Sequence, residues 1–575
     1  MNVLGLHVGH DSSAAVVVDG RLVADVAEER VSRVKHDASL PVHAIAACLE
    51  VAGLVISDID VVAVGTEAQL RPLNDLFDLW GSSKEEGASA ALAAPKTSLG
   101  RRLGIGSSDR SLLAKSFPLA AGTELVHVAH HLAHAAAAYY TSGWNDKQLI
   151  VTLDGVGDGL SGAIWRGEAG KIEPLHQFEE DGSLGWFYGN VTEALGWAHG
   201  DAEGTTMALA AYGDPAAALD ALGAFHPRFE DGSLARPHVF EPIRALARHG
   251  AFEWHSPEAE KIAALIPRLG RENIAAAAQR VLEEQVSNLI YPWLEREGTR
   301  ALACAGGVFL NVKVNQRIRE SGKVDRHHIY PNAGDAGLAA GAALHACHTV
   351  QPGTEIGNVK HMYLGPEYSN DEIVELLAAR GLDAERRDDI PAYAARLLAD
   401  GLAVGWVQGR MESGPRALGA RSILTSPVRI ENKEYLDTRV KLRPSFRPYC
   451  PSLAAERAAD YLERPLPEPF MISAFDVRPE KRDAVPAVVH VDGTARPQTV
   501  EREQNARYWE LIDAFGSLTG EYAVLNTSFN LQGEPIVCHP RDAIRAFYDS
   551  GLDYLILGDH VLAKPALRRP RRDAS

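Results

Sequence analysis

Two histidines and an aspartate stand at a spacing that suits a metal ion. His130 and His134 lie four residues apart in the Ala-rich segment HHLAHAAAAYY. This segment favours a helix, so both imidazoles should project from one helical face. The apolar segment LIVTL predicts a strand that ends in Asp154, and functional side chains of open α/β sheets gather at strand ends. Two neutral imidazoles and a carboxylate suit iron, zinc or manganese, whereas the absence of the Glu of an HExxH pattern excludes a zincin.

A second acidic strand end supplies a candidate fourth ligand. Asp335 lies in IYPNAGDAG, at the end of another predicted strand. The spacing of the histidines alone is weak evidence, because histidines near a helix start are often polar caps. His127 and His131 have the same spacing as His130 and His134. The addition of Asp335 strengthens the metal-site hypothesis without deciding which metal binds.

Fixed cations are concentrated in the last third of the chain. They occur in GRMESGPRALGARS, VKLRPSFRPY and DGTARPQTV, and they are Arg416, Arg421, Lys441, Arg443, Arg447 and Arg496. The planar fork of arginine matches phosphate and carboxylate oxygens, so convergence of several of these groups would form an oxyanion pocket. A solvated basic face is the usual alternative, but here the cations come in separate turn-rich blocks. LNTSFNLQGEPIV adds Asn526, Ser528 and Asn530, which share one side of an extended segment.

An internal duplication must position the first group of residues. Residues 3–8, 13–20 and 21–30 read as three strands with a hairpin turn at Asp19-Gly20, followed by a helix and another strand. From Gln148 the same order of a strand, an acidic-glycine turn and a strand begins again. The repeat, with Asp11 and Asp154 at equivalent turns, suggests the actin and sugar-kinase type of ATPase fold. In that fold two related halves close on a nucleotide.

Later segments continue this α/β scheme. The strand ALACA breaks at Gly306-Gly307 before a helix, which would let the backbone approach a ligand closely. The small residues of NAGDAGLAAGAALHA permit tight helix packing. Two inserted regions, about 68–120 and 214–300, read as helical or loop-rich. A turn-rich stretch between Ala346 and Asn370 marks a boundary, and we divide the chain into domains of residues 1–355 and 356–575.

Composition limits the classes of partner. A chain of 575 residues is too long for one core, and a net charge of −18 argues against nucleic-acid or anionic-membrane surfaces. Five scattered cysteines without a CxxC pattern fit a reducing compartment and exclude a thiolate metal cluster. The start has no basic region or cleavable apolar core, and no apolar run approaches membrane-spanning length. We therefore expect a cytoplasmic protein without nucleic-acid or membrane partners.

Many sequence blocks together resemble one family. The chain is similar nearly end to end to the NodU/CmcH family of O-carbamoyltransferases, whose blocks occur here in the family's order. They are GHDSSAAVVVDG, AEERVSRVKH, HHLAHAA, DGVGDG, EGTTMALAAYG, AGGVFLN, PNAGDAGLAAGAA, GRMESGPRALGARSI, FRPYCPS, DGTARPQTV and LNTSFNLQGEPIV.

The resemblance implies a fold and an activity. The fold would be α/β, with a duplicated actin-like N-terminal domain of the sugar-kinase and threonylcarbamoyl-transferase type and a YrdC-like α/β C-terminal domain. The second domain would bind carbamoyl phosphate and, with ATP and Mg²⁺, make carbamoyl adenylate. The first would pass the carbamoyl group to a hydroxyl of a small-molecule acceptor, such as a sugar or a natural product of antibiotic biosynthesis.

The resemblance also assigns roles to residues of this chain. The residues that match the family's iron (Fe²⁺) ligands are His130, His134, Asp154 and Asp335. Those that match the carbamoyl phosphate pocket are Arg416, Lys441, Arg447 and Arg496, with Ser528 and Asn530 as its polar wall. We expect the nucleotide site to include Gly155, Gly306, Gly307 and Asn311, and the catalytic pair to be His10 and Asp11, with His10 the nearest candidate base. Thr205 and Ser413 depart from the pattern, which commonly has Lys and Phe there.

Three other functions remain open at this point. A small-metabolite kinase of the actin-like class would leave the Arg-rich region unexplained. A nucleotide-gated regulator could use that region to sense a phosphorylated ligand. Threonylcarbamoylation of tRNA is disfavoured by the acidic charge and the lack of a basic stripe. The sequence also leaves open whether the protein forms a homodimer.

Overall fold

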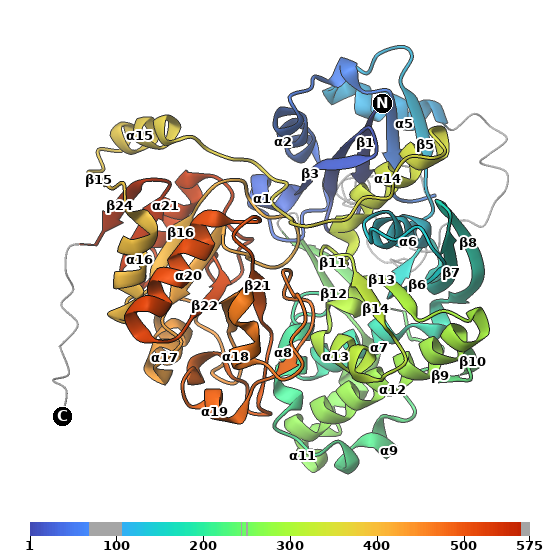
Figure 1. Ribbon diagram of the computed structural model, residues 1–575. Helices are drawn as coiled ribbons and strands as arrows, with labels where there is room; N and C mark the ends of the chain where they lie inside the picture. The colour runs from blue at the N-terminus through green and yellow to red at the C-terminus, as the bar shows by residue number, and fades with distance from the viewer. Residues whose placement is uncertain (68–105, 243, 249–250, 565–575) are drawn as a thin grey trace. The chain divides into compact units, whose positions relative to one another are not determined.

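A computed structural model describes residues 1–67, 106–242, 244–248 and 251–564 (Figure 1). The chain divides into two compact units, which we describe separately. The first comprises Met1–Gly365 with Ser413–Pro415 and Ile472–Ala474, and the second comprises Pro366–Glu412, Arg416–Met471 and Phe475–Ser575. The predicted domain boundary at 355/356 stays a prediction. Within the described ranges, no helix is both long and apolar enough to cross a membrane.

The first unit begins with a five-stranded sheet in the order β3-β2-β1-β4-β5. Strand β1 pairs antiparallel with β2 and parallel with β4. The predicted hairpin turn is confirmed, since Asp19 and Gly20 both have positive φ, of 47° and 83°, as two-residue hairpin turns require. The strands are β1 (Asn2–His7), β2 (Ser13–Val18), β3 (Arg21–Ala27), β4 (Val61–Val64) and β5 (Glu124–His127), with helices α1 (Glu28–Ser32) and α2 (Val42–Ala52) between β3 and β4.

A second sheet repeats this topology. Its order is β14-β13-β6-β7-β8, and β6 pairs antiparallel with β7 and parallel with β13, as β1 does with β2 and β4. The strands are β6 (Gln148–Gly157), β7 (Leu160–Glu168), β8 (Lys171–Glu179), β13 (Ala301–Ala305) and β14 (Arg326–Ile329). The same strand order with the same orientations confirms the internal duplication and the actin-like α/β fold.

The last helix of each repeat packs on the sheet of the other repeat. Helix α6 (His130–Tyr140) follows β5 and contacts β6, β7 and β13, whereas α14 (Leu338–Val350) follows β14 and contacts β1, β2 and β4. The two helices also contact each other (Figure 1). A Cβ on Gly341 of α14 would lie 1.9 Å from the carbonyl oxygen of Ala133, so the predicted tight packing of small residues is confirmed. This exchange brings the N-termini of both helices toward the ends of β1 and β6.

The inserted regions contain strands that the sequence did not predict. Between β8 and β13 the chain forms two hairpins among a series of helices. Their strands are only three to five residues long, which is too short for a clear alternation of apolar and polar residues. The elements are α7 (Leu184–Ala194), α8 (Glu203–Ala210), α9 (Leu219–Leu222), β9 (Arg228–Glu230), β10 (Ser233–Arg236), β11 (Arg244–Arg248), β12 (Ala251–His255), α10 (Pro257–Ala263), α11 (Ile266–Leu269) and α12 (Arg271–Glu297). Of the other inserted region, residues 68–105 lie outside the described residues, and α5 (Gly106–Ser116) follows them.

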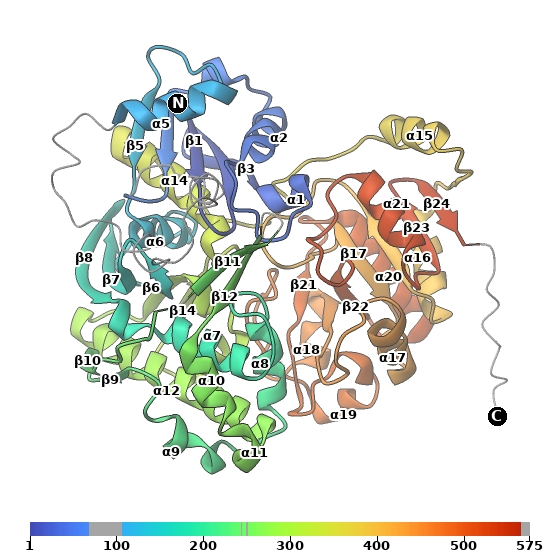
Figure 2. The same cartoon turned by 180° about the vertical axis from the view of Figure 1, so that it is seen from behind.

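The second unit is built on one mixed sheet of eight strands in the order β15-β24-β23-β16-β17-β22-β18-β21 (Figure 2). Helices α16 and α20 cover one face around the buried Trp406, while α17 and α21 pack on the other. This α/β architecture agrees with the predicted fold class. The strands are β15 (Glu385–Arg386), β16 (Val404–Val407), β17 (Arg421–Thr425), β18 (Cys450–Ala454), β21 (Gln498–Val500), β22 (Ala523–Ser528), β23 (Tyr554–Leu557) and β24 (His560–Ala563). The principal helices are α15 (Asn370–Ala379), α16 (Ile390–Ala399), α17 (Ile430–Arg439), α20 (Ala506–Thr519) and α21 (Pro540–Tyr548).

Candidate functional site

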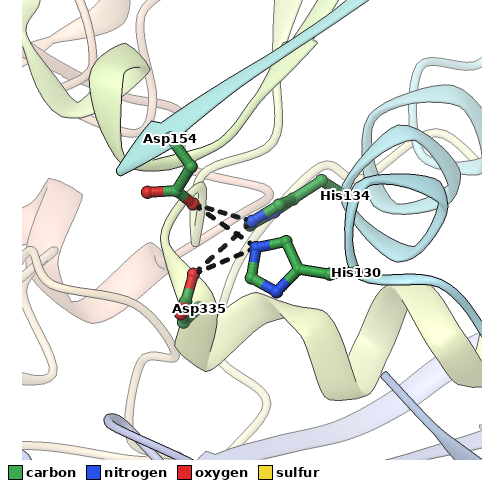
Figure 3. Close-up of side chains that lie close together, drawn as sticks. All are labelled: His130, His134, Asp154 and Asp335. Atoms are coloured by element: carbon green, nitrogen blue, oxygen red, sulfur yellow. Dashed lines mark hydrogen bonds and ion pairs between the residues drawn. The ribbon is translucent and has the colours of Figure 1, made fainter. Parts of the chain in front are cut away.

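Four side chains of the first unit converge on one point (Figure 3). Nε2 of His134 lies 3.0 Å from Asp154 Oδ2 and 3.5 Å from Asp335 Oδ1. Nε2 of His130 lies 3.8 Å and 3.7 Å from the same two oxygens. One ligand atom from each residue falls within 4.8 Å of all the others. The structure therefore brings together the four residues that the sequence suggested as metal ligands, although their role as ligands stays a prediction.

Local structure explains this convergence. His130 and His134 occupy the first two turns of α6, Asp154 lies where the β6–β7 ladder is interrupted between Leu153 and Gly157, and Asp335 begins a 3₁₀ turn before α14. A Cβ on Gly157 would lie 2.2 Å from the His130 ring. Only glycine therefore leaves room for this imidazole against β6.

Asp158 binds the backbone at the start of helix α6, where His130 lies. Its Oδ2 accepts hydrogen bonds from the backbone N–H groups of His130 at 2.8 Å and Glu67 at 3.0 Å, and its Oδ1 accepts one from Thr66 Oγ1 at 2.7 Å. A carboxylate at a helix N-terminus satisfies an otherwise unpaired donor and favours the helix dipole. Asp158 thus fixes the backbone from which His130 projects, a role that the sequence did not indicate.

The electrostatics of the group suit a cation. Burial lowers the pKa of His134, but its contacts with Asp154 and Asp335 outweigh burial and raise that pKa to about 9. Burial raises the pKa of Asp154, yet His130 and His134 hold it well below its usual range. Nε2 of His130 is buried and makes no hydrogen bond among the described residues. A buried imidazole nitrogen without a hydrogen bond, next to two carboxylates, is the arrangement that a divalent metal would complete.

The overlapping histidine pair has a structural role. His131 places its two ring nitrogens 3.0 Å from Thr152 Oγ1 and 3.0 Å from the carbonyl oxygen of Leu160, and burial lowers its pKa to about 3. His127 lies 3.1 Å from Asp109. Both rings are engaged elsewhere, so this second pair does not compete with the first for a metal.

The predicted catalytic pair lies at the turn after β1. His10 Nδ1 is 3.0 Å from Asp11 Oδ2, and His7 Nε2 lies 3.1 Å from the carbonyl oxygen of His10. Burial lowers the pKa of His10, but Asp11 and, less strongly, Asp335 raise it to about 10 overall. His10 is therefore protonated at neutral pH in this structure. Protonation favours a role of His10 as a hydrogen-bond donor over its predicted role as a base. A cation bound beside Asp335 would offset that carboxylate and lower the pKa of His10.

The residues predicted to bind a nucleotide all have structural contacts. A Cβ on Gly306, whose φ is +104°, would lie 2.1 Å from the carbonyl oxygen of Leu153, and one on Gly307 would lie 3.0 Å from Asp154 Oδ1. The N–H of Gly155 donates to Asp154 Oδ1 at 2.8 Å. Asn311 caps helix α13 (Val312–Glu320) and exchanges hydrogen bonds with Gln279. These contacts explain the four residues without invoking a ligand. Contact of these residues with a nucleotide stays a prediction.

Strand register in the second unit gathers the predicted oxyanion residues at one edge of its sheet. Antiparallel pairing sets the end of β22 beside the starts of β17 and β18, and parallel pairing aligns the starts of β18 and β21. Arg416, Arg447 and Arg496 shortly precede β17, β18 and β21, while Ser528 and Asn530 end and follow β22. Five of the six predicted residues thus lie at the same sheet edge, and Lys441 reaches it through hydrogen bonds.

Hydrogen bonds join Lys441, Ser528 and Asn530, whereas the three arginines act on one another through their charges. Lys441 Nζ lies 2.8 Å from both the Ser528 carbonyl oxygen and Asn530 Oδ1, and Ser528 Oγ donates to Asn530 Oδ1 at 2.6 Å. Burial and, less strongly, the charges of Arg496 and Arg447 together lower the pKa of Arg416 to about 9. Mutual repulsion of this kind is relieved when an anion binds between the cations.

Two of the fixed cations do not belong to this pocket. The guanidinium of Arg421 is fully buried and donates to the carbonyl oxygens of Pro366, Gln408, Gly409, Ala420 and Cys538. Arg443 lies 3.2 Å from Asp437 and covers the ring of Tyr449. Arg421 and Arg443 are therefore not among the cations that converge, because their guanidinium groups bind backbone carbonyl oxygens around the pocket.

Comparison with known proteins extends over nearly the whole chain. The family profile described as carbamoyltransferase N-terminus matches residues 2–70 and 119–344, and the one described as carbamoyltransferase C-terminus matches residues 395–564. Nodulation protein NolNO of Sinorhizobium fredii is 37% identical over 96% of this chain and 79% of its own length. An uncharacterised protein of Synechocystis is 35% identical over 98% and 96%. Component A of the Acidaminococcus fermentans (R)-2-hydroxyglutaryl-CoA dehydratase aligns with 61% of this chain and 98% of its own, at 16% identity and a TM-score of 0.33.

Proposed function

This chain belongs to the carbamoyltransferase family, and we propose that it uses ATP and carbamoyl phosphate to carbamoylate a hydroxyl group of a small-molecule acceptor. The protein is a carbamoyl-transferring enzyme, so the proposal concerns its donor, intermediate and acceptor. We assign donor activation to residues 356–575 and carbamoyl transfer to residues 1–355.

The cationic sheet edge of the second unit is the observation that carries this proposal. A phosphate dianion needs several charge-assisted donors to replace its water. The positive charges of Arg447 and Arg496 act on Arg416 and lower its pKa, and Lys441 lies beside the polar groups of Ser528 and Asn530. This set matches the charge of carbamoyl phosphate, and the amide and hydroxyl groups suit its carbamoyl end.

Carbamoyl adenylate gives a chemically balanced route. Water cleaves carbamoyl phosphate to carbamate and phosphate, and a carbamate oxygen then attacks the α-phosphorus of ATP, so that pyrophosphate leaves. The acceptor hydroxyl attacks the carbamoyl carbon of the mixed anhydride, loses its proton and displaces AMP. A neutral alcohol reacts more readily with this anhydride than with carbamoyl phosphate, and the nucleotide provides additional binding energy.

A divalent metal, with Fe²⁺ the ion that we propose, would be held by His130, His134, Asp154 and Asp335. The buried Nε2 of His130 and the two carboxylates fit such an ion. When bound, it would supply Lewis-acid polarisation of an oxygen. The chain's own contribution nearby is His10, which we propose binds the acceptor hydroxyl and is held in place by Asp11.

Product analysis tests the proposal. The purified full-length protein is incubated with ATP, Mg²⁺, carbamoyl phosphate and a panel of sugars and other hydroxyl-bearing natural products. We expect an acceptor to gain the mass of one carbamoyl group only when both ATP and carbamoyl phosphate are present, with AMP and pyrophosphate as the nucleotide products. Release of ADP with a phosphorylated acceptor would instead identify a small-metabolite kinase.

Two variants separate the proposed half-reactions. His130→Ala should still bind carbamoyl phosphate and release AMP and pyrophosphate slowly, but it should make no carbamoylated acceptor. Arg447→Ala should lose both activities. If His130→Ala also abolishes acceptor-independent pyrophosphate release, donor activation requires the first unit, and the assignment of the two steps to separate domains is wrong.

A further inference from the structure

A network of side chains with alternating charges extends from His10 to residues outside the predicted site. Asp11 uses both carboxylate oxygens, with Oδ2 at 3.0 Å from His10 Nδ1 and Oδ1 at 2.6 Å from His36 Nδ1. His36 Nε2 in turn lies 3.3 Å from Asp201 Oδ1. Lys35 is the last member of this network, and its Nζ lies 2.5 Å and 2.7 Å from the two carboxylate oxygens of Asp201. Each charged group therefore contacts groups of the opposite sign.

Two residues at the centre of this network, Asp11 and His36, have unusual backbone conformations. Asp11 and His36 both adopt left-handed conformations, with φ of 62° and 53°, which cost free energy in residues other than glycine. The carboxylate of Glu29 accepts a hydrogen bond from the N–H of His36 at 3.0 Å. Asp201 comes from the turn before α8, far from β1 in sequence. The contacts of Asp11 with His36, and of His36 with the distant Asp201, therefore hold the two turns that contain Asp11 and His36 next to each other.

The imidazole rings of His10 and His36 each contact Asp11 through one nitrogen, Nδ1. His10 contacts Asp11 through Nδ1, which leaves Nε2 facing Gly200 and the Trp254 ring, whose centroid is 6.2 Å from that of His10. The Asp11 carboxylate can turn about its own side-chain bonds, so its contact with His10 does not by itself orient His10. His36, bound on the opposite oxygen and anchored by Asp201, removes that freedom.

We propose that His36 and Asp201 are positioning residues that lock the Asp11 carboxylate, and through it the His10 ring, in the orientation that presents Nε2 of His10 to the acceptor hydroxyl. This inference rests on the proposed role of His10 in carbamoyl transfer. The geometric part, that His36 and Asp201 orient the Asp11–His10 pair, is independent of which reaction is catalysed.

The titration of His10 separates positioning from a mere charge effect. The positive charge of His36 lowers the pKa of His10, while Asp11 raises it. If His36 acts only as a neighbouring charge, its removal in His36→Ala should raise the pKa of His10 above its parental value. If His36 positions Asp11, its removal lets the carboxylate turn away, and the pKa of His10 should fall from about 10 toward 6.5. The two accounts predict shifts of opposite sign.

We would measure this pKa by NMR on the full chain labelled at histidine Cε1, with the His10 signal assigned from His10→Gln. His36→Asn places an amide donor near the position of Nδ1 but cannot reach Asp201, so it should keep most of the parental pKa. Asp201→Asn should give a smaller fall than His36→Ala. The exposed His176 of β8 gives the control His176→Asn, which should leave the pKa unchanged.

Kinetics supply a second readout. In His36→Ala, kcat/KM for the acceptor should fall about 10- to 100-fold, as expected for a misplaced reacting group, while carbamoyl phosphate affinity should stay within twofold. His36→Asn should recover most of the loss. An increase in the His10 pKa in His36→Ala would overturn the proposal. So would the loss of a bound metal ion in that variant, because Asp11, Glu29 and His36 lie within 4.8 Å of one another and could hold a cation instead. If the parent transfers no carbamoyl group, the proposed function fails, but the NMR titration still decides the positioning role.

Discussion

Gly157→Ala should damage the four-residue group without changing any proposed ligand. The added Cβ would lie 2.2 Å from the Cγ and Cδ2 atoms of the His130 ring, whereas carbon atoms in contact are separated by about 3.5 Å or more. The ring must therefore retreat by about 1 Å, or the end of β6 must move by a similar distance. Metal–ligand distances tolerate only about 0.2 Å, so a shift of this size removes His130 from the coordination shell.

The expected magnitude follows from that displacement. Overpacking of a buried position costs about 1–3 kcal/mol, which the chain should survive with a lower melting temperature. Metal affinity should fall by at least about tenfold, because disturbing the residues that orient a ligand has effects of about 10- to 100-fold. His130→Ala should give a loss of similar or greater size.

The assay is chelator competition followed by elemental analysis of the full-length protein. Gly122→Ala is the matched control, because a Cβ at Gly122 would have no neighbouring atom within 4 Å. It should retain the parental metal content. If Gly157→Ala binds metal within twofold of the parent while its circular dichroism shows a folded protein, His130 is not a ligand in the geometry described.

Three further outcomes follow from the site geometry. Arg447→Ala should weaken carbamoyl phosphate binding by about 2–5 kcal/mol in a calorimetric titration, while the exposed Arg502, which pairs with Glu510, gives the control Arg502→Ala; equal affinities would remove Arg447 from the pocket. The pKa of His134 is raised from 6.5 to about 9, so a metal must displace its proton below that pH, and apparent metal affinity should rise about tenfold per pH unit up to about pH 9. A flat profile across this range would contradict the assignment of His134. Arg421→Met should lower the unfolding free energy by at least about 3 kcal/mol in denaturant titration, because five carbonyl oxygens lose a charged donor; a loss under about 1 kcal/mol would reject this structural role.

Local patterns predicted the repeated core. The hairpin at Asp19-Gly20 and the strand before Asp154 follow from turn chemistry and runs of apolar residues, which act within a few positions of the sequence. The convergence of His130, His134, Asp154 and Asp335 was suggested by helix spacing and by two strand ends. It required only that the parallel strands β6 and β14, which flank β13, end on the same side of their sheet, as strands of an α/β sheet do.

Tertiary packing decided what the sequence could not. His36 and Asp201 join His10 and Asp11 through contacts between distant turns, and no local pattern pairs them. Arg421 lies in the same turn-rich block as Arg416, so composition alone could not separate a buried guanidinium bound to backbone carbonyls from one that could bind an anion. The hydrogen bonds of Arg421 to five carbonyl oxygens make that distinction, and they depend on tertiary packing.

The central claim is that carbamoyl phosphate is activated as carbamoyl adenylate, and exchange of labelled pyrophosphate into ATP tests it without any acceptor. The full-length protein is incubated with ATP, Mg²⁺ and radiolabelled pyrophosphate, with and without carbamoyl phosphate, and the label in ATP is measured. Reversible adenylation predicts exchange that depends on carbamoyl phosphate, is lost in Arg447→Ala and persists in Arg502→Ala. Absence of exchange in a protein that nevertheless carbamoylates an acceptor, or formation of ADP in place of AMP, would contradict the adenylate mechanism.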